Sequence, residues 1–108
     1  MRQSDLVTVS LQGDDGEPRP ALVIQSDAVS EAASRTVLPL TSKLVDAPLI
    51  RIAVAPTPGN GLRAPSQVMI DKAVTVPAGK LGPVFGTFDD GAMLAVNRSL
   101  ALFLGVAG

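Results

Sequence analysis

Residues 17 to 27 read Glu-Pro-Arg-Pro-Ala-Leu-Val-Ile-Gln-Ser-Asp, and this stretch decides the fold. Proline lies on both sides of Arg19, so Pro18 has a fixed φ and Pro20 pushes the Arg towards an extended backbone. The apolar run over residues 21–25 predicts a strand that begins immediately afterwards. An Arg held at the start of a strand suits the binding of a phosphate or a carboxylate. A solvated Arg in a surface turn is the alternative, since most Arg side chains are exposed.

A second apolar strand is predicted at residues 35–41, and it ends in two adjacent hydroxyl residues, Thr41 and Ser42. Upstream, β-branched residues within 6–11 predict a strand that forms a hairpin with residues 20–26. The polar, Gly-containing segment 12–17 is the turn of that hairpin. Its acidic residues fit no calcium-loop pattern, so we expect solvated turn acids and no metal ion.

Further elements follow along the chain. A short helical turn is expected after Asp27, and strands are expected at residues 49–54, 66–70 and 73–76. The turn-dense segment 57–65 is either a simple connector or a loop that shapes a substrate site. Residues 88–105 predict the main helix, which Asp89 or Asp90 can cap and Gly105 can end. One face of this helix is apolar at helical spacing: Met93, Val96, Leu100, Phe103 and Leu104.

Composition limits the possible functions of this 108-residue chain, which we expect to form a single domain over residues 1–108. The chain contains no Cys and no His, which removes disulfides, thiolate metal sites and the commonest acid–base catalyst. A net charge of −1 excludes a basic nucleic-acid coat, so any RNA contact must be local. No apolar run has the length of a membrane span and no signal-peptide core is present, so we expect a cytoplasmic protein that binds no membrane.

The two central motifs resemble a known family. Arg-Pro-Ala-Leu-Val-Ile-Gln-Ser-Asp at residues 19–27, followed by Val-Leu-Pro-Leu-Thr-Ser at residues 37–42, is similar to the MazF/PemK toxin endoribonucleases, or mRNA interferases. The segments 65–76, 80–82 and 93–105 agree in order and spacing. The resemblance implies a mainly β fold with a C-terminal helix (α+β), in the form of a small SH3-like open barrel of the MazF/PemK/CcdB type.

The resemblance also implies a function. Members of the family are toxins of type II toxin–antitoxin systems, and they form homodimers whose groove binds single-stranded RNA until a cognate antitoxin blocks it. The ribose 2′-hydroxyl attacks the neighbouring phosphate, so the reaction needs neither a cofactor nor a metal ion. This chemistry suits a chain without His or Cys, because the nucleophile belongs to the substrate. The protein must position the phosphate and stabilise its added negative charge.

Two catalytic residues carry over from the family pattern. Arg19, the Arg before Pro at the strand start, would stabilise charge on the phosphate, and Thr41 would donate a hydrogen bond to it. An Arg is a poor base because a guanidinium stays protonated, so Glu17 is an alternative proton acceptor. The candidate RNA-binding residues are Glu17, Pro20, Ser42 and Arg63.

One loop departs from the family pattern and keeps other functions open. Many members carry Gly-Ser-Glu-Gln before the Arg, whereas residues 13–17 here read Gly-Asp-Asp-Gly-Glu. The added acids would repel phosphate and favour a weak nuclease or an inactive, antitoxin-binding homologue. A gyrase poison of the CcdB type is a further alternative on the same barrel. However, the chain end, Leu-Gly-Val-Ala-Gly, lacks the aromatic tip of that class.

Overall fold

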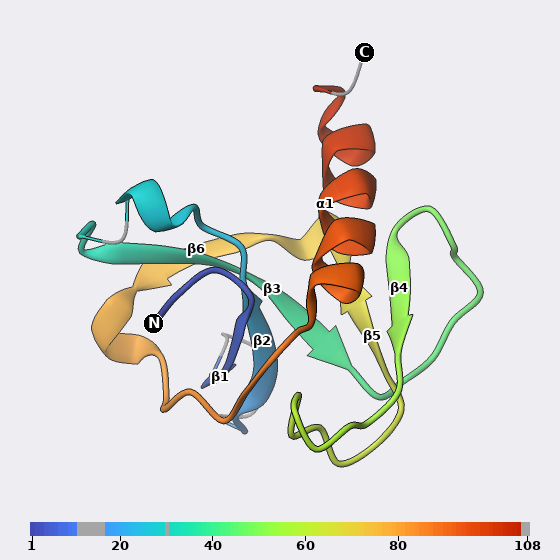
Figure 1. Cartoon of the computed structure of the whole chain (residues 1–108), viewed down its shortest axis with the longest axis horizontal. Helices are drawn as coiled ribbons and strands as arrows, with labels where there is room; N and C mark the ends of the chain where they lie inside the picture. The colour runs from blue at the N-terminus through green and yellow to red at the C-terminus, as the bar shows by residue number, and fades with distance from the viewer. Residues whose placement is uncertain (11–16, 30, 107–108) are drawn as a thin grey trace.

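The computed structural model describes residues 1–10, 17–29 and 31–106, which form a curled, seven-stranded antiparallel sheet and one α-helix (Figure 1). The strands are β1 (Asp5–Val9), β2 (Arg19–Val23), β3 (Ser34–Thr41), β4 (Arg51–Val54), β5 (Ser66–Met69), β6 (Val74–Pro77) and β7 (Gly86–Thr87). The helix is α1 (Asp90–Leu104), and three short 3-10 turns are η1 (Asp27–Val29), η2 (Ile70–Lys72) and η3 (Ala78–Lys80). The predicted fold class, mainly β with a C-terminal helix, is confirmed.

Strand β3 is the centre of the sheet because it pairs with three other strands. Its middle pairs with β2, with Leu38 opposite Leu22. On its other edge, its first half pairs with β6 and its last two residues pair with β5. The order along the sheet is β4-β5-β3-β2-β1-β7. Since β5 and β6 share one edge of β3 and are joined by η2, the sheet must curl, which gives the half-barrel seen in Figure 1.

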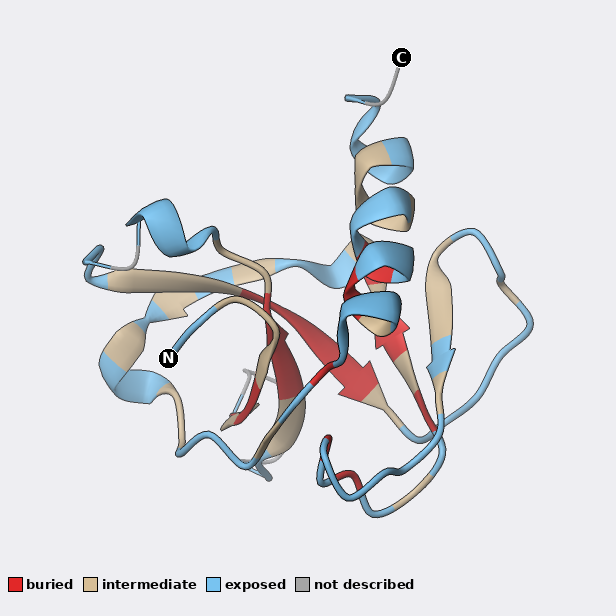
Figure 2. Cartoon of the chain, in the orientation of Figure 1, coloured by how far each residue is buried: buried red, intermediate tan, exposed pale blue. Residues whose placement is uncertain are grey.

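Both faces of the central strands are buried, which explains their continuous apolar runs. Leu6, Leu22 and Leu38 belong to a cluster that also contains Met93 and Val96 of α1. The alternate residues of the same strands form a second cluster on the other face: Val7, Val9, Ala21, Val23 and Val37. Figure 2 shows the buried residues concentrated on these strands and on the part of α1 nearest the sheet. The start of β2 and the end of β3 are therefore fixed by a packed core.

Helix α1 has the ends that the sequence predicts. The side chain of Asp89 accepts a hydrogen bond of 2.7 Å from the Ala92 N–H, and Gly105 adopts the left-handed conformation that ends the helix, with φ of 73°. Phe88 precedes the helix and is buried in the core. The buried part of the apolar face is shorter than predicted: Met93 and Val96 are buried and Leu100 packs against the core, but Phe103 and Leu104 are exposed.

Several strand limits differ from those predicted. Strand β4 begins at Arg51, because residues 48–50 form a turn that starts at Pro48. Strands β1 and β2 end at Val9 and Val23, earlier than residues 11 and 26, and form the predicted antiparallel pair. Strands β5 and β6 both pair with β3, with η2 between them. The short strand β7 was not predicted; its Gly86 pairs with Leu6.

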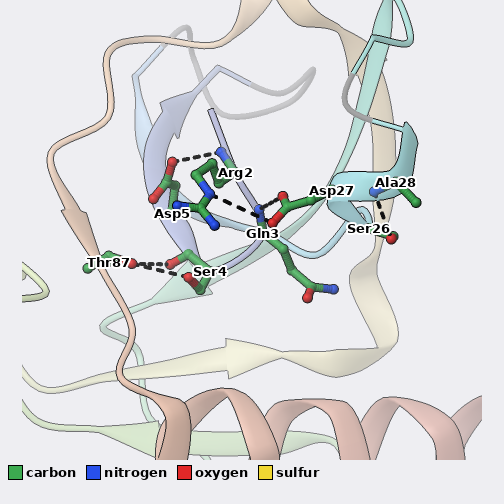
Figure 3. Close-up of polar contacts among 8 residues, drawn as sticks. All are labelled: Arg2, Gln3, Ser4, Asp5, Ser26, Asp27, Ala28 and Thr87. Atoms are coloured by element: carbon green, nitrogen blue, oxygen red, sulfur yellow. Dashed lines mark hydrogen bonds and ion pairs between the residues drawn. The ribbon is translucent and has the colours of Figure 1, made fainter.

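Polar contacts fasten the N-terminal segment to the sheet (Figure 3). The Gln3 N–H donates to Asp27 Oδ1 at 2.8 Å, so Asp27 ties η1 to the N-terminus. The cap within η1 comes instead from Ser26 Oγ, which accepts from the Ala28 N–H at 3.1 Å. Ser4 contacts Thr87 of β7, 83 residues away, through their hydroxyls at 3.2 Å. No helix within the described residues has the length and apolar character that a membrane span requires.

Candidate active site

A cavity of about 640 Å³ opens where β2 begins and β3 ends. We call it the strand-end cavity; it is lined by Thr8, Pro18, Pro20, Leu40, Thr41, Ser42, Gly61, Leu62, Arg63, Ala64, Ser66 and Phe85. In Figure 1 the tip of the β3 arrow and the loop joining β4 to β5 lie together at the lower edge of the sheet. Four of the six candidate residues line the cavity: Pro20, Thr41, Ser42 and Arg63. No carboxylate is among the lining residues that the structure describes, so the cavity wall suits an anion.

Thr41 holds its hydroxyl in a defined orientation at the cavity. Its Oγ1 accepts a hydrogen bond of 3.1 Å from the Lys43 backbone N–H, which is the local turn that Thr favours at the end of a strand. A hydroxyl that already accepts in this way keeps its own hydrogen available for donation. Thr41 can therefore donate to an oxygen of a bound anion without a change of backbone.

The loop that follows Thr41 is tied to β5. Gln67 is the cross-strand partner of Thr41, and its amide makes two hydrogen bonds to one residue of that loop. The Val45 N–H donates to Gln67 Oε1 at 3.1 Å, and Gln67 Nε2 donates to the Val45 carbonyl at 2.8 Å. The β3–β4 loop is therefore held on both sides of Ser42, by the sheet before it and by Gln67 after it.

The opposite wall of the cavity is built on Asn60, a buried polar residue. Its Oδ1 accepts from the N–H groups of Thr57 and Leu62 at 3.0 Å each, and its Nδ2 donates to the Ala55 carbonyl at 2.9 Å. Together with the hydrogen bond from the Thr87 N–H of β7 to the Gly59 carbonyl at 3.0 Å, these bonds satisfy backbone groups of the turn-dense segment. The exposed cation Arg63 is thereby attached to an ordered loop.

Arg19 lies beside the cavity without being one of its lining residues. Its neighbours on both sides, Pro18 and Pro20, line the cavity. Strand alternation puts Arg19 on the same face of β2 as Ala21, and its backbone is opposite Val9 of β1. Ala21 is paired with Pro39, and the same register extended by two residues aligns Arg19 with Thr41. Arg19 is half-buried, and its backbone lies at the edge where β2 begins and β3 ends.

Glu17 is exposed and lies one residue before Pro18 of the cavity wall. The rest of the altered loop, residues 13–16, lies outside the described residues, so its acids are not located relative to the cavity. Within the described parts of the chain, no group of three His, Cys, Asp or Glu side chains is arranged to hold a metal ion.

Sequence reasoning named four of the twelve residues that line the cavity and missed the other eight. The missed residues include Thr8, Ser66 and Phe85, from segments that were interpreted only as strands or turns, and Leu62, from the segment 57–65 that was left open as a connector or a substrate-shaping loop. These residues come together only because β1, β5 and the segment just before β7 meet around the end of β3 in the folded structure. A signal was available for Phe85: it is one of only three aromatic residues, and it lies in the segment Gly-Pro-Val-Phe-Gly at residues 82–86, which has no helical or strand periodicity.

Comparison with known proteins agrees with this architecture. The family model for the PemK-like, MazF-like toxin of type II toxin–antitoxin systems matches residues 2–104. A protein of Mycolicibacterium smegmatis named probable endoribonuclease MazF is 44% identical over 109 residues, which span all of both chains. The resemblance predicted from the two strand motifs is therefore confirmed.

Solved structures give the same fold at lower identity. The toxin MazF-mt6 of Mycobacterium tuberculosis is 22% identical, with a TM-score of 0.79 over 94% of this chain and 96% of that one. A mycobacterial endoribonuclease in complex with its cognate antitoxin is 21% identical, with a TM-score of 0.84 over 100% of this chain and 98% of that one. The chain belongs to the PemK-like, MazF-like family of toxins of type II toxin–antitoxin systems.

Proposed function

We propose that this toxin cuts single-stranded RNA at the strand-end cavity, by attack of a ribose 2′-hydroxyl and without a metal ion. Family membership and the 44% identical relative support an endoribonuclease toxin over a CcdB-type gyrase poison or an inactive homologue. The observation that carries the proposed site is a cavity at the aligned ends of β2 and β3. Its described lining contains hydroxyls and a cation but no carboxylate.

The proposed reaction is an internal transfer of the phosphoryl group. The substrate's 2′-oxygen forms a bond to phosphorus while the bond from phosphorus to the 5′-oxygen of the next nucleotide breaks. The 2′-hydroxyl gives up its proton to a base, and the departing 5′-oxygen gains one. The products are a 2′,3′-cyclic phosphate and a 5′-hydroxyl end. The protein supplies positioning and charge stabilisation, because both reacting groups belong to the substrate.

Arg19 and Thr41 have complementary roles in this proposal. The guanidinium of Arg19 would pair with the non-bridging phosphate oxygens, whose negative charge grows as the new bond forms. Thr41 would donate its hydroxyl hydrogen to one of these oxygens; its Oγ1 already accepts from the Lys43 N–H. A donor aimed at developing charge contributes about 2.7–4 kcal/mol of transition-state stabilisation in comparable sites.

Glu17 is our candidate for the proton acceptor. It is the described carboxylate closest in sequence to Arg19, and it is exposed beside the proline-lined wall. A carboxylate can take the 2′-hydroxyl proton, whereas a guanidinium stays protonated. Pro20 and Ser42 would contact the substrate from the two strand ends, and Arg63 would contact a second phosphate from the facing loop.

The proposed partners follow from the relatives. The antitoxin complex of the mycobacterial endoribonuclease supports a cognate antitoxin for this chain as well. Large apolar residues remain exposed on the outer part of α1: Leu94, Leu102, Phe103 and Leu104. Uncovered apolar area of this kind supports a homodimer. Messenger RNA, the proposed substrate, would be met in the cytoplasm.

A long single-stranded RNA tests the proposal. We would incubate it with purified protein in excess EDTA and map the new ends by sequencing. Cuts at a short recurring sequence, carrying 5′-hydroxyl ends and absent with Arg19→Ala, are expected. Intact RNA with a folded wild-type protein would overturn the proposal. A toxin that still arrests growth would then act on another target, such as gyrase.

A further inference from the structure

We propose that Phe85 is a stacking platform for one unpaired nucleobase of the RNA, next to the phosphate that is cut. The inference rests on the proposed function, because it concerns the same strand-end cavity. It adds a specificity-determining residue that lies 44 positions from Thr41 in the chain yet shares the cavity wall with it.

Phe85 is the aromatic residue that the cavity offers. Among the three Phe residues of the chain, Phe88 is buried in the core and Phe103 is exposed on α1, away from the cavity lining. Phe85 is 37% exposed and lines the cavity. Recognition of single-stranded RNA depends on aromatic rings that stack against unpaired bases. A base that covers the exposed part of this ring would remove further apolar area from water.

The backbone around Phe85 is held firmly, as a stacking platform requires. The Phe85 N–H donates to the Leu6 carbonyl of β1 at 2.9 Å. On its other side the Asn60 loop packs closely against it: a Cβ added to Gly61 would lie 2.7 Å from the Phe85 carbonyl oxygen and 3.1 Å from its ring Cδ1. Gly61 has φ of 66°, and a Cβ on Gly86 would lie 2.1 Å from the Asn60 carbonyl oxygen. Gly61 therefore lets the loop approach the Phe85 ring, and Gly86 lets the backbone after Phe85 approach Asn60.

The remainder of the cavity matches a base in shape and polarity. A nucleobase has two apolar faces and a polar edge. Beside the Phe85 ring, the cavity offers the apolar side chains of Leu40 and Leu62, and the hydroxyl of Ser66 lies on the same lining. The Ser66 hydroxyl donates to the Ala64 carbonyl at 2.9 Å, which leaves its oxygen to accept from a base edge. Arg63 supplies the charge for the backbone phosphate.

The test uses an oligonucleotide built around a mapped cleavage site. It carries a 2′-deoxy sugar at the cut position, so it binds without being cut, and 2-aminopurine replaces each base beside the cut in turn. Stacking on Phe85 should change the 2-aminopurine fluorescence at one position. The change should be lost in Phe85→Leu and kept in Phe85→Trp. Val84→Ala is the matched control: Val84 is the exposed neighbour of Phe85 but does not line the cavity.

The kinetic result should follow the same pattern. Phe85→Leu should lower kcat/KM for RNA by about 5- to 150-fold, mostly through KM, because stacking is worth that much per base. Unchanged kcat/KM in a folded Phe85→Leu that cuts at the same sites overturns this inference alone. Wild-type protein that cuts no RNA overturns the proposed function and this inference with it. If Phe85→Leu does not fold, a fluorescence change in wild type that Phe85→Trp keeps supports the inference. Its absence from wild type, or its loss in Phe85→Trp, overturns the inference.

Discussion

Gln67 and Val45 exchange two hydrogen bonds, although 22 residues separate them in the chain. The amide of Gln67 thereby behaves like an added strand partner for the β3–β4 loop, directly across from Thr41. Because Thr41 and Ser42 lie between this contact and the core of β3, the pair fixes one wall of the strand-end cavity.

Gln67→Ala should therefore loosen that wall without altering the catalytic groups. Two exposed hydrogen bonds are lost, so the free energy of unfolding in urea should fall by about 1 kcal/mol. KM for RNA should rise, because Ser42 is less well positioned. Hydrogen exchange at the Val45 amide should become faster. Protection of that amide equal to wild type would show that Gln67 does not hold the loop.

Thr41→Val tests the hydroxyl at nearly constant volume. We expect kcat to fall by about 100-fold or more, as when one charge-stabilising donor is removed. Thr41→Ser should recover most of the activity, since it keeps both the donor and the acceptor for the Lys43 N–H. Thr75→Val on β6 is a matched control, because Thr75 pairs with Thr36 away from the cavity. Equal loss in the Val and Ser variants would contradict the role given to the hydroxyl.

Arg19→Lys separates charge from geometry. A lysine keeps the positive charge but lacks the planar fork of donors, so its rate should lie between those of wild type and Arg19→Ala. The Ala variant should lose about 100- to 1,000-fold in kcat. Arg98→Ala, an exposed position on α1, serves as the control for net charge. A lysine variant with full activity would show that the fork is not required.

Glu17→Gln tests the proton acceptor through the pH dependence of the rate. A carboxylate acts as a base only when ionised, so the wild-type rate should fall on the acid side of the profile. With Gln the rate should be low and that acid limb should disappear. A variant that keeps the acid limb would assign the base to another group.

Gly86→Ala should be strongly destabilising, whereas Gly79→Ala should be nearly neutral. An added Cβ at Gly86 meets the backbone carbonyl of Asn60 at 2.1 Å, but at Gly79 it meets no atom within 4 Å. The Asn60 loop would have to shift away from Phe85, so the thermal midpoint of Gly86→Ala should drop by several degrees. Equal midpoints for the two variants would contradict the close packing of the Asn60 loop against Gly86 of β7.

The predictable part of the fold is the part with continuous apolar runs and clear helix caps. The strands that contain Leu22 and Leu38 were predicted because both faces are buried, and the helix limits followed from Asp89 and Gly105. The pairing of β3 with both β5 and β6 was not readable, because it depends on curling of the sheet. The same limit explains the site: residues next to Arg19 and Thr41 in sequence were named, but Phe85 reaches the cavity only through tertiary packing.

The burial of helix α1 was also only partly predictable from the sequence. Helical spacing grouped Phe103 with Met93 and Val96, but the core covers this face only as far as Leu100, and Phe103 is exposed. The main contacts of α1 are with η2 and β4. Periodicity predicts which face is apolar, whereas the length of the opposing surface decides how much of that face is buried.

The most direct test of the proposed chemistry is a single 2′-deoxy substitution in an RNA oligonucleotide, at the ribose whose 2′-hydroxyl should attack. Cleavage at that position should vanish, while an otherwise identical oligonucleotide deoxy-substituted one nucleotide away should still be cut, both in excess EDTA. The cut control should carry a 5′-hydroxyl end and a 2′,3′-cyclic phosphate. Equal cleavage of the two oligonucleotides would contradict attack by the substrate's own hydroxyl and the roles given to Arg19 and Thr41.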